Sequence, residues 1–179
     1  MLGLGIEAME YFAVQVKTRA EERFIKLFKV RQPQAAVTIH FPRKRLPIRQ
    51  KGMTKNIVSP IFPGYIFLET EGRVEPEVYW VLRRIDGFFR FLKSNQDVRP
   101  LSGRDLETVL HFIRIGPVAE KSKVYFDDSD RIIIQEGPLK GLEGLIVKVD
   151  KRKGRAKIKL DLYDDSFAVD LAFEVIART

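Results

Sequence analysis

Few residues of this chain have the types and spacing that catalysis requires. The two histidines, His40 and His111, have no serine, cysteine or carboxylate at the spacing of a catalytic triad or dyad. Cysteine is absent, which excludes disulfides, thiolate zinc sites and iron–sulfur clusters. We therefore expect a protein that is not an enzyme.

Two acidic clusters are the candidates for a metal site that lacks cysteine and histidine ligands. Residues 127–130 contain three aspartates, and Asp164-Asp165 is a pair. Neither cluster has the glycine and the closing glutamate of a calcium-binding EF-hand loop. We expect both to be solvated turns, and we expect no metal and no cofactor.

The glycine-rich segment Gly137–Gly144 (GPLKGLEG) could cradle a phosphate group. However, neither the P-loop nor the dinucleotide-binding fingerprint is present. Pro138 removes a backbone donor, and Glu143 would repel a phosphate. The segment is therefore predicted to be a sharp structural turn.

Basic residues are the strongest chemical signal in the chain. Lys and Arg number 32 against 24 Asp and Glu, a net charge of +8. Residues 1–115 carry 20 of these cations and 12 of the acids, whereas residues 116–179 carry 12 of each. No acid occurs between Arg23 and Leu68. A polyanion relieves the self-repulsion of such a stretch, so we expect contact with nucleic acid, and a merely solvated face is the alternative. The candidate RNA-binding residues here are Arg43, Lys44, Arg45, Arg49, Lys51 and Lys55.

A second basic segment, residues 151–155, lies between two expected strands. Its four cations are Lys151, Arg152, Lys153 and Arg155. We include them as candidate contacts to the RNA backbone. A solvated hairpin tip is the alternative.

Aromatic residues gather near the first basic stretch. Phe62, Tyr65 and Phe67 surround Pro63-Gly64, and the single tryptophan, Trp80, follows. Aromatic side chains anchor protein interfaces, but they also fill cores. The sequence leaves these two interpretations equally open.

The elements that must position these residues fall into two groups. Apolar runs and helical spacing predict strands alternating with helices up to residue 115, which indicates an α/β sandwich with helices against one sheet. The basic stretch 43–59 is predicted to be a long, mobile loop or a hairpin. The expected strands are 11–16, 37–41, 65–68 and 88–92, and the expected helices are 19–31, 76–85 and 102–113.

After residue 115 the helical periodicity disappears. Residues 116–129 are polar and are predicted to be a linker. Five short strands are expected beyond it, at 132–135, 145–149, 156–162, 167–171 and 172–176, the last after a turn. The predicted fold class is thus α+β, with an N-terminal α/β sandwich at 9–115, a linker at 116–129 and a small all-β barrel at 130–179.

No apolar run reaches the roughly 18–20 residues that span a bilayer. Met1–Glu10 has neither the basic start nor the apolar length of a signal peptide. We expect a cytoplasmic monomer without membrane contact. The sequence leaves open whether Met1 or Met9 is the natural start.

Three segments together resemble the NusG family of transcription elongation factors. Tyr11–Val16 (YFAVQV) is similar to the opening strand of the family's N-terminal domain, called NGN. Phe62-Pro63-Gly64-Tyr65 reproduces its F-P-G-Y signature, and Gly137–Val147 resembles the start of a KOW motif. The resemblance extends from Tyr11 to Ile176.

The resemblance implies an NGN domain followed by a KOW barrel. In the family, an aromatic-lined cavity of the NGN domain docks on the clamp helices of RNA polymerase, which favours a closed clamp and suppresses pausing. The implied polymerase-binding residues are Phe62, Pro63, Gly64, Tyr65 and Phe67. The KOW barrel recruits a second partner, such as ribosomal protein S10 or the termination factor Rho.

This chain departs from the housekeeping pattern at two places. The barrel segment that usually reads I-F-G-R is Leu162-Tyr163-Asp164-Asp165, and residues 81–92 lack the usual N-T-P before the glycine. With these departures, the chain is similar to a specialised LoaP-type paralog, an antiterminator that works with a leader RNA hairpin. The alternatives are a housekeeping NusG that couples polymerase to Rho or S10, and a KOW-containing ribosome-associated RNA-binding protein.

Overall fold

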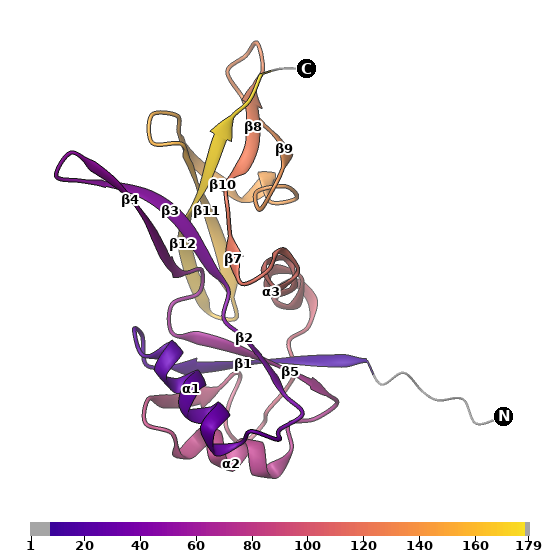
Figure 1. Cartoon of the computed structure of the whole chain (residues 1–179). Coiled ribbons are helices and arrows are strands. Elements are labelled where there is room, and N and C mark those ends of the chain that lie inside the picture. Colours follow the sequence, from indigo (N-terminus) through magenta and orange to yellow (C-terminus); the bar gives the residue numbers. More distant parts are fainter. Residues whose placement is uncertain (1–7, 178–179) are drawn as a thin grey trace. The chain divides into compact units, whose positions relative to one another are not determined.

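The computed structural model describes residues 8–177, so Met1, one of the two candidate starts, lies outside the described residues. The described chain forms two compact units (Figure 1). The first comprises residues 8–41 and 62–107, and the second comprises residues 42–61 and 108–177. The chain enters the second unit at residue 42, returns to the first at residue 62 and enters the second again within helix α3 (Gly103–Ile115).

The first unit contains a four-stranded antiparallel sheet of order β2-β5-β1-β6. Strand β5 is almost wholly buried, as its unbroken apolar run predicts. Alternation along β5 places Tyr65 and Phe67 on one face of the sheet and Ile66 and Leu68 on the other. The strands are β1 (Met9–Val16), β2 (Thr38–His40), β5 (Tyr65–Glu71) and β6 (Phe88–Phe91).

Helices α1 (Glu21–Arg31) and α2 (Pro76–Arg84) cover the sheet face that carries Ile66 and Leu68. Phe24 and Phe28 of α1 are buried in this core. Val78 and Leu82 of α2 join them, four residues apart, on the face that helical spacing predicts. Pro76 occupies the first helical turn of α2, where no intrahelical N–H is needed.

The second unit contains a five-stranded sheet of order β10-β11-β12-β8-β9 and a three-stranded sheet of order β4-β3-β7. A short 3₁₀ helix, η1 (Glu143–Leu145), precedes β10. The strands of the larger sheet are β8 (Ser122–Phe126), β9 (Ile132–Glu136), β10 (Ile146–Asp150), β11 (Arg155–Leu162) and β12 (Asp165–Val175). Those of the smaller sheet are β3 (Arg43–Gln50), β4 (Met53–Pro60) and β7 (Val118–Ala119).

Strand β11 shows why this part of the chain is β rather than helical. Ala156, Ile158, Leu160 and Leu162 are all buried, and the residues between them are not. This period of two suits a strand with one face on a core. Strand β12 pairs with β11 on one side and with β8 on the other.

The basic stretch 43–59 is a hairpin of β3 and β4, the second of the two forms predicted for it. Two other expectations differ from the structure. Residues 116–129 contain β7 and β8, which pair within the two sheets and so give this segment backbone partners that a linker lacks. The predicted turn before Ala172 is wrong, because β12 runs unbroken to Val175 and pairs with a different neighbour at each end.

The glycine-rich segment is a structural turn, as predicted. Gly137 has φ +105°, and a Cβ atom there would lie 2.6 Å from Ser122 Cα. The buried Ser122 hydroxyl oxygen accepts a hydrogen bond from the Leu139 N–H at 2.9 Å. Only glycine leaves room for this close approach of two chain segments.

The α+β fold class is therefore confirmed. Within residues 8–177, none of the helices has the length and apolarity needed to cross a bilayer.

Candidate nucleic-acid interface

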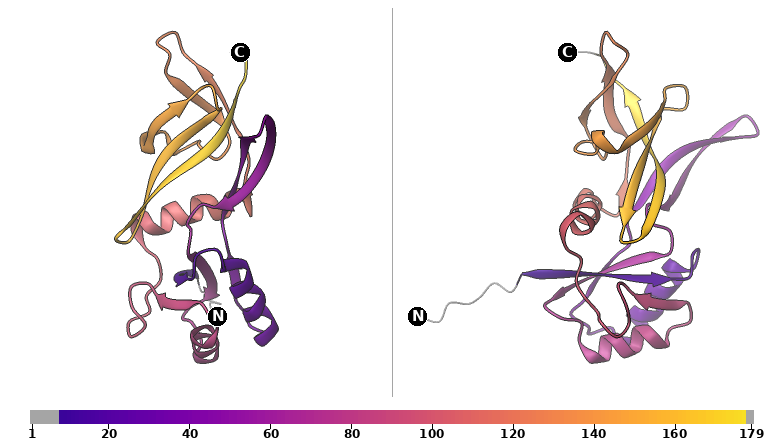
Figure 2. Two further views of the ribbon diagram at one scale, coloured as in Figure 1. Left: turned by 90° about the vertical axis from the view of Figure 1, so that its left-hand side faces the viewer. Right: turned by 180° about the vertical axis from the view of Figure 1, so that it is seen from behind.

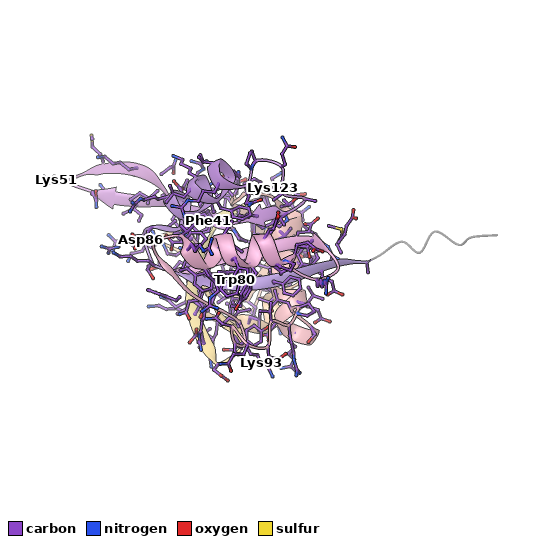
Figure 3. All side chains as sticks on the ribbon, turned by 90° about the horizontal axis from the view of Figure 1, so that it is seen from below. Phe41, Lys51, Trp80, Asp86, Lys93 and Lys123 are labelled. Carbon is purple, nitrogen blue, oxygen red and sulfur yellow. The ribbon has the colours of Figure 1, made fainter. Side chains whose placement is uncertain are left out.

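The β3–β4 hairpin carries exposed cations toward its tip. Its two-residue turn, Lys51-Gly52, has φ +48° and +79°, the signature of a type I′ turn that matches the twist of paired strands. Arg49, Lys51 and Lys55 are exposed along this end of the hairpin, and Lys51 lies at its tip (Figure 3).

The second group of cations lies on the turn between β10 and β11. The Asp150 carboxylate accepts a hydrogen bond from the Lys153 N–H at 2.9 Å, and the Gly154 N–H donates to the Lys151 carbonyl. These bonds fix the turn backbone. The side chains of Arg152 and Lys153 are exposed.

Arg155 joins the hairpin to the larger sheet. Its Nη2 donates a hydrogen bond to the Pro47 carbonyl at 2.9 Å, and its Nη1 lies 3.9 Å from the Asp170 carboxylate. Strand β3 lies beside β12, as the views in Figures 1 and 2 show. Residues 47 and 155 are thus neighbours, although 108 positions separate them.

Cations crowd one another behind this junction. Burial lowers the pKa of Lys44. Asp170 opposes that shift, and the nearby charges of Arg155 and Lys157 reinforce it. Lys157 also lies 3.5 Å from Asp170, so one carboxylate serves several cations.

Two surface hollows flank the junction and share Lys153 and Arg155. The first is lined by Pro47, Ile48, Arg49, Thr54, Arg152, Lys153 and Arg155. The second is lined by Lys148, Asp150, Lys153, Arg155, Lys157 and Asp170. The fold thus brings together cations from two predicted basic segments that are about one hundred residues apart in sequence.

Other predicted cations have partners within the protein. Arg45 makes two hydrogen bonds to Glu120, at 3.0 and 3.1 Å. Lys151 pairs with Asp130 and lies 4.0 Å from the centre of the Phe126 ring. Arg43 is half-buried at the start of β3. These three side chains are engaged in the fold rather than presented on the hollows.

The sequence analysis missed Lys148 and Lys157, which line the second hollow. The alternation around Lys157 predicted a polar face for its strand, but the neighbours of that face depend on the strand order. Lys148 lies on the adjacent strand β10, which pairs with β11 at Lys157.

The aromatic signature Phe62-Pro63-Gly64-Tyr65 forms a tight turn in the first unit. The Tyr65 N–H donates to the Phe62 carbonyl at 3.1 Å, and Gly64 has φ +82°. Proline at the second position and a left-handed glycine at the third are typical of a type II turn. The buried Glu21 carboxylate accepts a hydrogen bond from the Gly64 N–H at 2.9 Å and so ties the turn to α1.

The structure distinguishes core from surface among the aromatic residues. Phe62, Tyr65 and Phe67 are buried, and the rings of Phe62 and Phe67 meet edge to face at 5.5 Å. Pro63 is exposed. Polymerase binding by this signature stays a prediction.

Trp80 of α2 is 52% exposed (Figure 3). The Arg83 guanidinium lies 5.4 Å from the centres of the Trp80 and Tyr79 rings and donates a hydrogen bond to the Tyr79 hydroxyl. The first unit therefore presents an aromatic and a cationic side chain together on the surface of α2.

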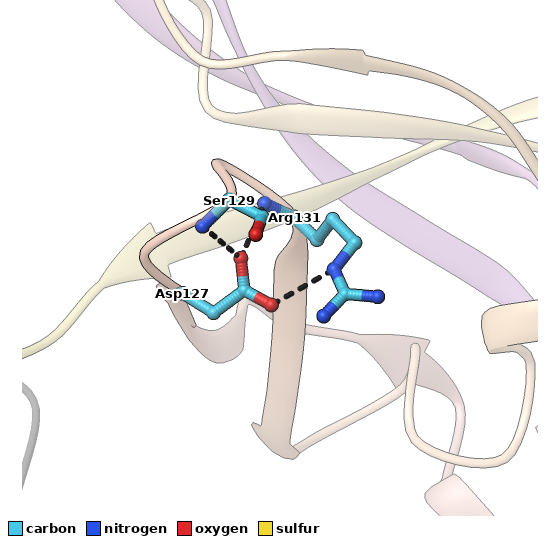
Figure 4. Close-up of polar contacts among 3 residues, drawn as sticks. All are labelled: Asp127, Ser129 and Arg131. Atoms are coloured by element: carbon cyan, nitrogen blue, oxygen red, sulfur yellow. Dashed lines mark hydrogen bonds and ion pairs between the residues drawn. The ribbon is translucent and has the colours of Figure 1, made fainter.

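The histidines and the acidic cluster at residues 127–130 have structural partners. His40 lies 2.6 Å from Glu69, and the Nε2–H of His111 donates to the Pro138 carbonyl at 2.7 Å. The Asp127 carboxylate accepts hydrogen bonds from the Ser129 and Arg131 backbone (Figure 4). Among the described residues, no group of three or more acidic, histidine or cysteine side chains is placed to hold a metal ion.

These features define a class of protein: an α+β chain of two units, one of which presents a basic surface. The family model described as "Transcription termination factor nusG" matches residues 9–110. Since this match covers more than half of the chain, the chain belongs to the NusG family, which is a family of transcription factors.

Named relatives and a solved structure resemble the chain over most of its length. The chain is 22% identical over 175 residues to the transcription termination/antitermination protein NusG of Pasteurella multocida, with 97% of this chain and 93% of the relative covered. It is 24% identical over 187 residues to that of Thermus thermophilus, with 96% and 99% covered. The structure titled "Domain interaction in Thermotoga maritima NusG" matches 92% of this chain and 94% of its own, with a TM-score of 0.55 and 19% identity. That likeness shows the fold alone.

Proposed function

We propose that this protein is a transcription elongation or processive antitermination factor that binds RNA polymerase through its first unit and RNA through its second. The observation that carries the proposal is the conjunction of NusG family membership with the two basic hollows. Relatives named for both termination and antitermination support the general role. The LoaP-type paralog, working with a leader RNA hairpin, is the specific form that we favour.

Polymerase docking is assigned to the turn Phe62–Tyr65. Because its aromatic side chains are buried, direct contact falls to the exposed Pro63 and to the surface shaped by the rings beneath it. Apolar contact at such a turn would supply affinity for the clamp helices of polymerase, as the family resemblance implies.

A pull-down of core RNA polymerase by the full chain tests this assignment. Pro63→Glu adds a charge at the turn without opening the core, and Pro33→Glu is the matched control at another exposed turn of the same unit. We expect the wild type and Pro33→Glu to capture polymerase and Pro63→Glu to fail, with circular dichroism confirming that each is folded.

Two outcomes would count against the proposal. Equal capture by all three proteins would overturn docking through this turn, while polymerase binding itself would stand. No capture by the wild type, even at low salt, would overturn the elongation-factor function and favour the ribosome-associated alternative, which predicts co-sedimentation with ribosomal subunits.

The housekeeping function remains the second candidate, because the relatives' names include termination. It requires the second unit to bind Rho or ribosomal protein S10. The hairpin tip between β11 and β12 carries Asp164 and Asp165, both exposed, where that contact would be made. Saturable binding of the full chain to purified Rho or S10 would favour this candidate over the specialised paralog.

A further inference from the structure

We infer that the two basic hollows form one track that holds the phosphodiester backbone of a double-stranded RNA stem. The inference rests on the proposed function and adds where the RNA lies and which part of it is recognised. Lys153 and Arg155 line both hollows, so the two are adjacent. Their combined lining contains six cationic side chains and two acidic ones.

The cations are of the types that phosphate requires. Arg49 and Arg152 are exposed and can each present a planar pair of N–H donors to two phosphate oxygens, whereas Arg155 donates to the Pro47 carbonyl and holds the hairpin beside the turn. Lys148, Lys153 and Lys157 add mobile point charges around them. Arginine and lysine from β3, β10, β11 and the turn between β10 and β11 could therefore contact successive phosphates along one strand of RNA.

The acidic side chains are engaged in organising the cations. Asp150 accepts the Lys153 N–H within the turn. Asp170 lies near Arg155 and Lys157, at 3.9 and 3.5 Å. An incoming phosphate therefore meets a surplus of positive charge.

The lining also indicates which form of RNA fits. Among the described residues that line the two hollows, none is aromatic. Proteins that bind single-stranded RNA rely on aromatic side chains for base stacking, whereas double-stranded RNA is bound through its shape, phosphates and 2′-hydroxyls. The track therefore suits a base-paired stem, and it should tolerate changes in the stem's sequence.

Fluorescence anisotropy with the full chain tests the track. The probes are two RNA stems of unrelated sequence, a single strand taken from one of them, and the DNA duplex of the same sequence. Arg152→Gln/Lys153→Gln removes two exposed charges from the track, and Arg49→Gln removes one from the hairpin side. Lys26→Gln/Lys29→Gln, on the exposed face of α1, is the matched control for lost charge.

We expect both RNA stems to bind more tightly than the single strand or the DNA duplex. Arg152→Gln/Lys153→Gln should weaken both stems equally, by about tenfold or more, and should reduce the steepness of the log–log salt dependence by about 2. Arg49→Gln should weaken both stems as well, with a change in salt slope of about 1. The control should bind within about twofold of the wild type.

Results that contradict the track can be told apart from results that contradict the proposed function. If the wild type binds the stems but the track variants bind as tightly as the control, the track is wrong and RNA binding lies elsewhere. Tighter binding of the single strand or the DNA duplex would overturn the assignment to an RNA stem. If the wild type captures polymerase but binds none of the probes, the track and the RNA contact both fail while the polymerase contact stands.

Discussion

The carboxylate of Glu21 accepts a hydrogen bond from the backbone N–H of Gly64 at 2.9 Å, and only 3% of Glu21 is exposed. A buried carboxylate is costly unless it is hydrogen-bonded, so this contact accounts for an acid inside the first unit. Glu21 also opens α1, where the helix dipole favours negative charge. The signature turn is thus fixed by a residue outside the signature.

Substitution of Glu21 should destabilise the first unit. We expect Glu21→Ala to lower the free energy of unfolding by about 1.5–3 kcal/mol, because the Gly64 N–H loses a charged acceptor. Glu21→Gln retains an acceptor oxygen and should cost less. The exposed neighbour Glu22 shares the first turn of α1, so Glu22→Ala controls for the helix dipole. Urea unfolding measures all three, and equal losses for Glu21→Ala and Glu22→Ala would contradict the role given to the Gly64 contact.

Gly137→Ala should destabilise the second unit. The new Cβ atom would meet Ser122 Cα at 2.6 Å, in addition to the strain of φ +105°. We expect a loss of about 2 kcal/mol or more. Gly116→Ala is the control, because Gly116 has φ +118° with nothing within 4 Å of the added atom. Thermal unfolding compares the stabilities of the two variants. If Gly137→Ala loses no more stability than Gly116→Ala, Ser122 can move aside.

Arg155→Met should loosen the β3–β4 hairpin from β12. The substitution removes the hydrogen bond to the Pro47 carbonyl but keeps much of the side-chain volume. Amide protons of β3 should then exchange faster by hydrogen–deuterium exchange, because local opening of the hairpin becomes less costly. Lys159→Met changes an exposed residue of the same strand and should leave β3 unchanged. Unaltered exchange in Arg155→Met would mean that β3 is held by other contacts.

Asp127 predicts a dependence of stability on pH. The hydrogen bond from the Arg131 backbone is the main cause that lowers the pKa of Asp127 below its usual value of 3.8, and the Arg131 side chain and the Ser129 backbone add to it. A lowered folded-state pKa means that Asp127 contributes stability above its unfolded-state pKa and loses it as pH falls through the folded-state value.

The melting temperature of Asp127→Asn should therefore fall below that of the wild type at neutral pH, and the difference should shrink below about pH 3.8. Asp164→Asn, at another exposed turn, serves as the control. A difference that stays constant from pH 7 to pH 2 would show that the ionised carboxylate is not what matters at position 127.

Local patterns were sufficient for much of the secondary structure. The period of two in 156–162 predicted β11, and helical spacing predicted α2, because side-chain direction follows from backbone geometry within a few residues. The hairpin was ambiguous, since Arg43–Ser59 contains many cations and little apolar alternation to mark β3 and β4.

The sequence by itself determined the α+β fold class and the presence of two basic segments. Only the tertiary structure decided that Phe62 and Tyr65 are buried and that Arg45 is paired with Glu120 whereas Arg152 is exposed. The physical reason is the same in each case. Burial and ion pairing depend on which distant segment packs nearby, and that follows from strand order, which no local window of residues contains.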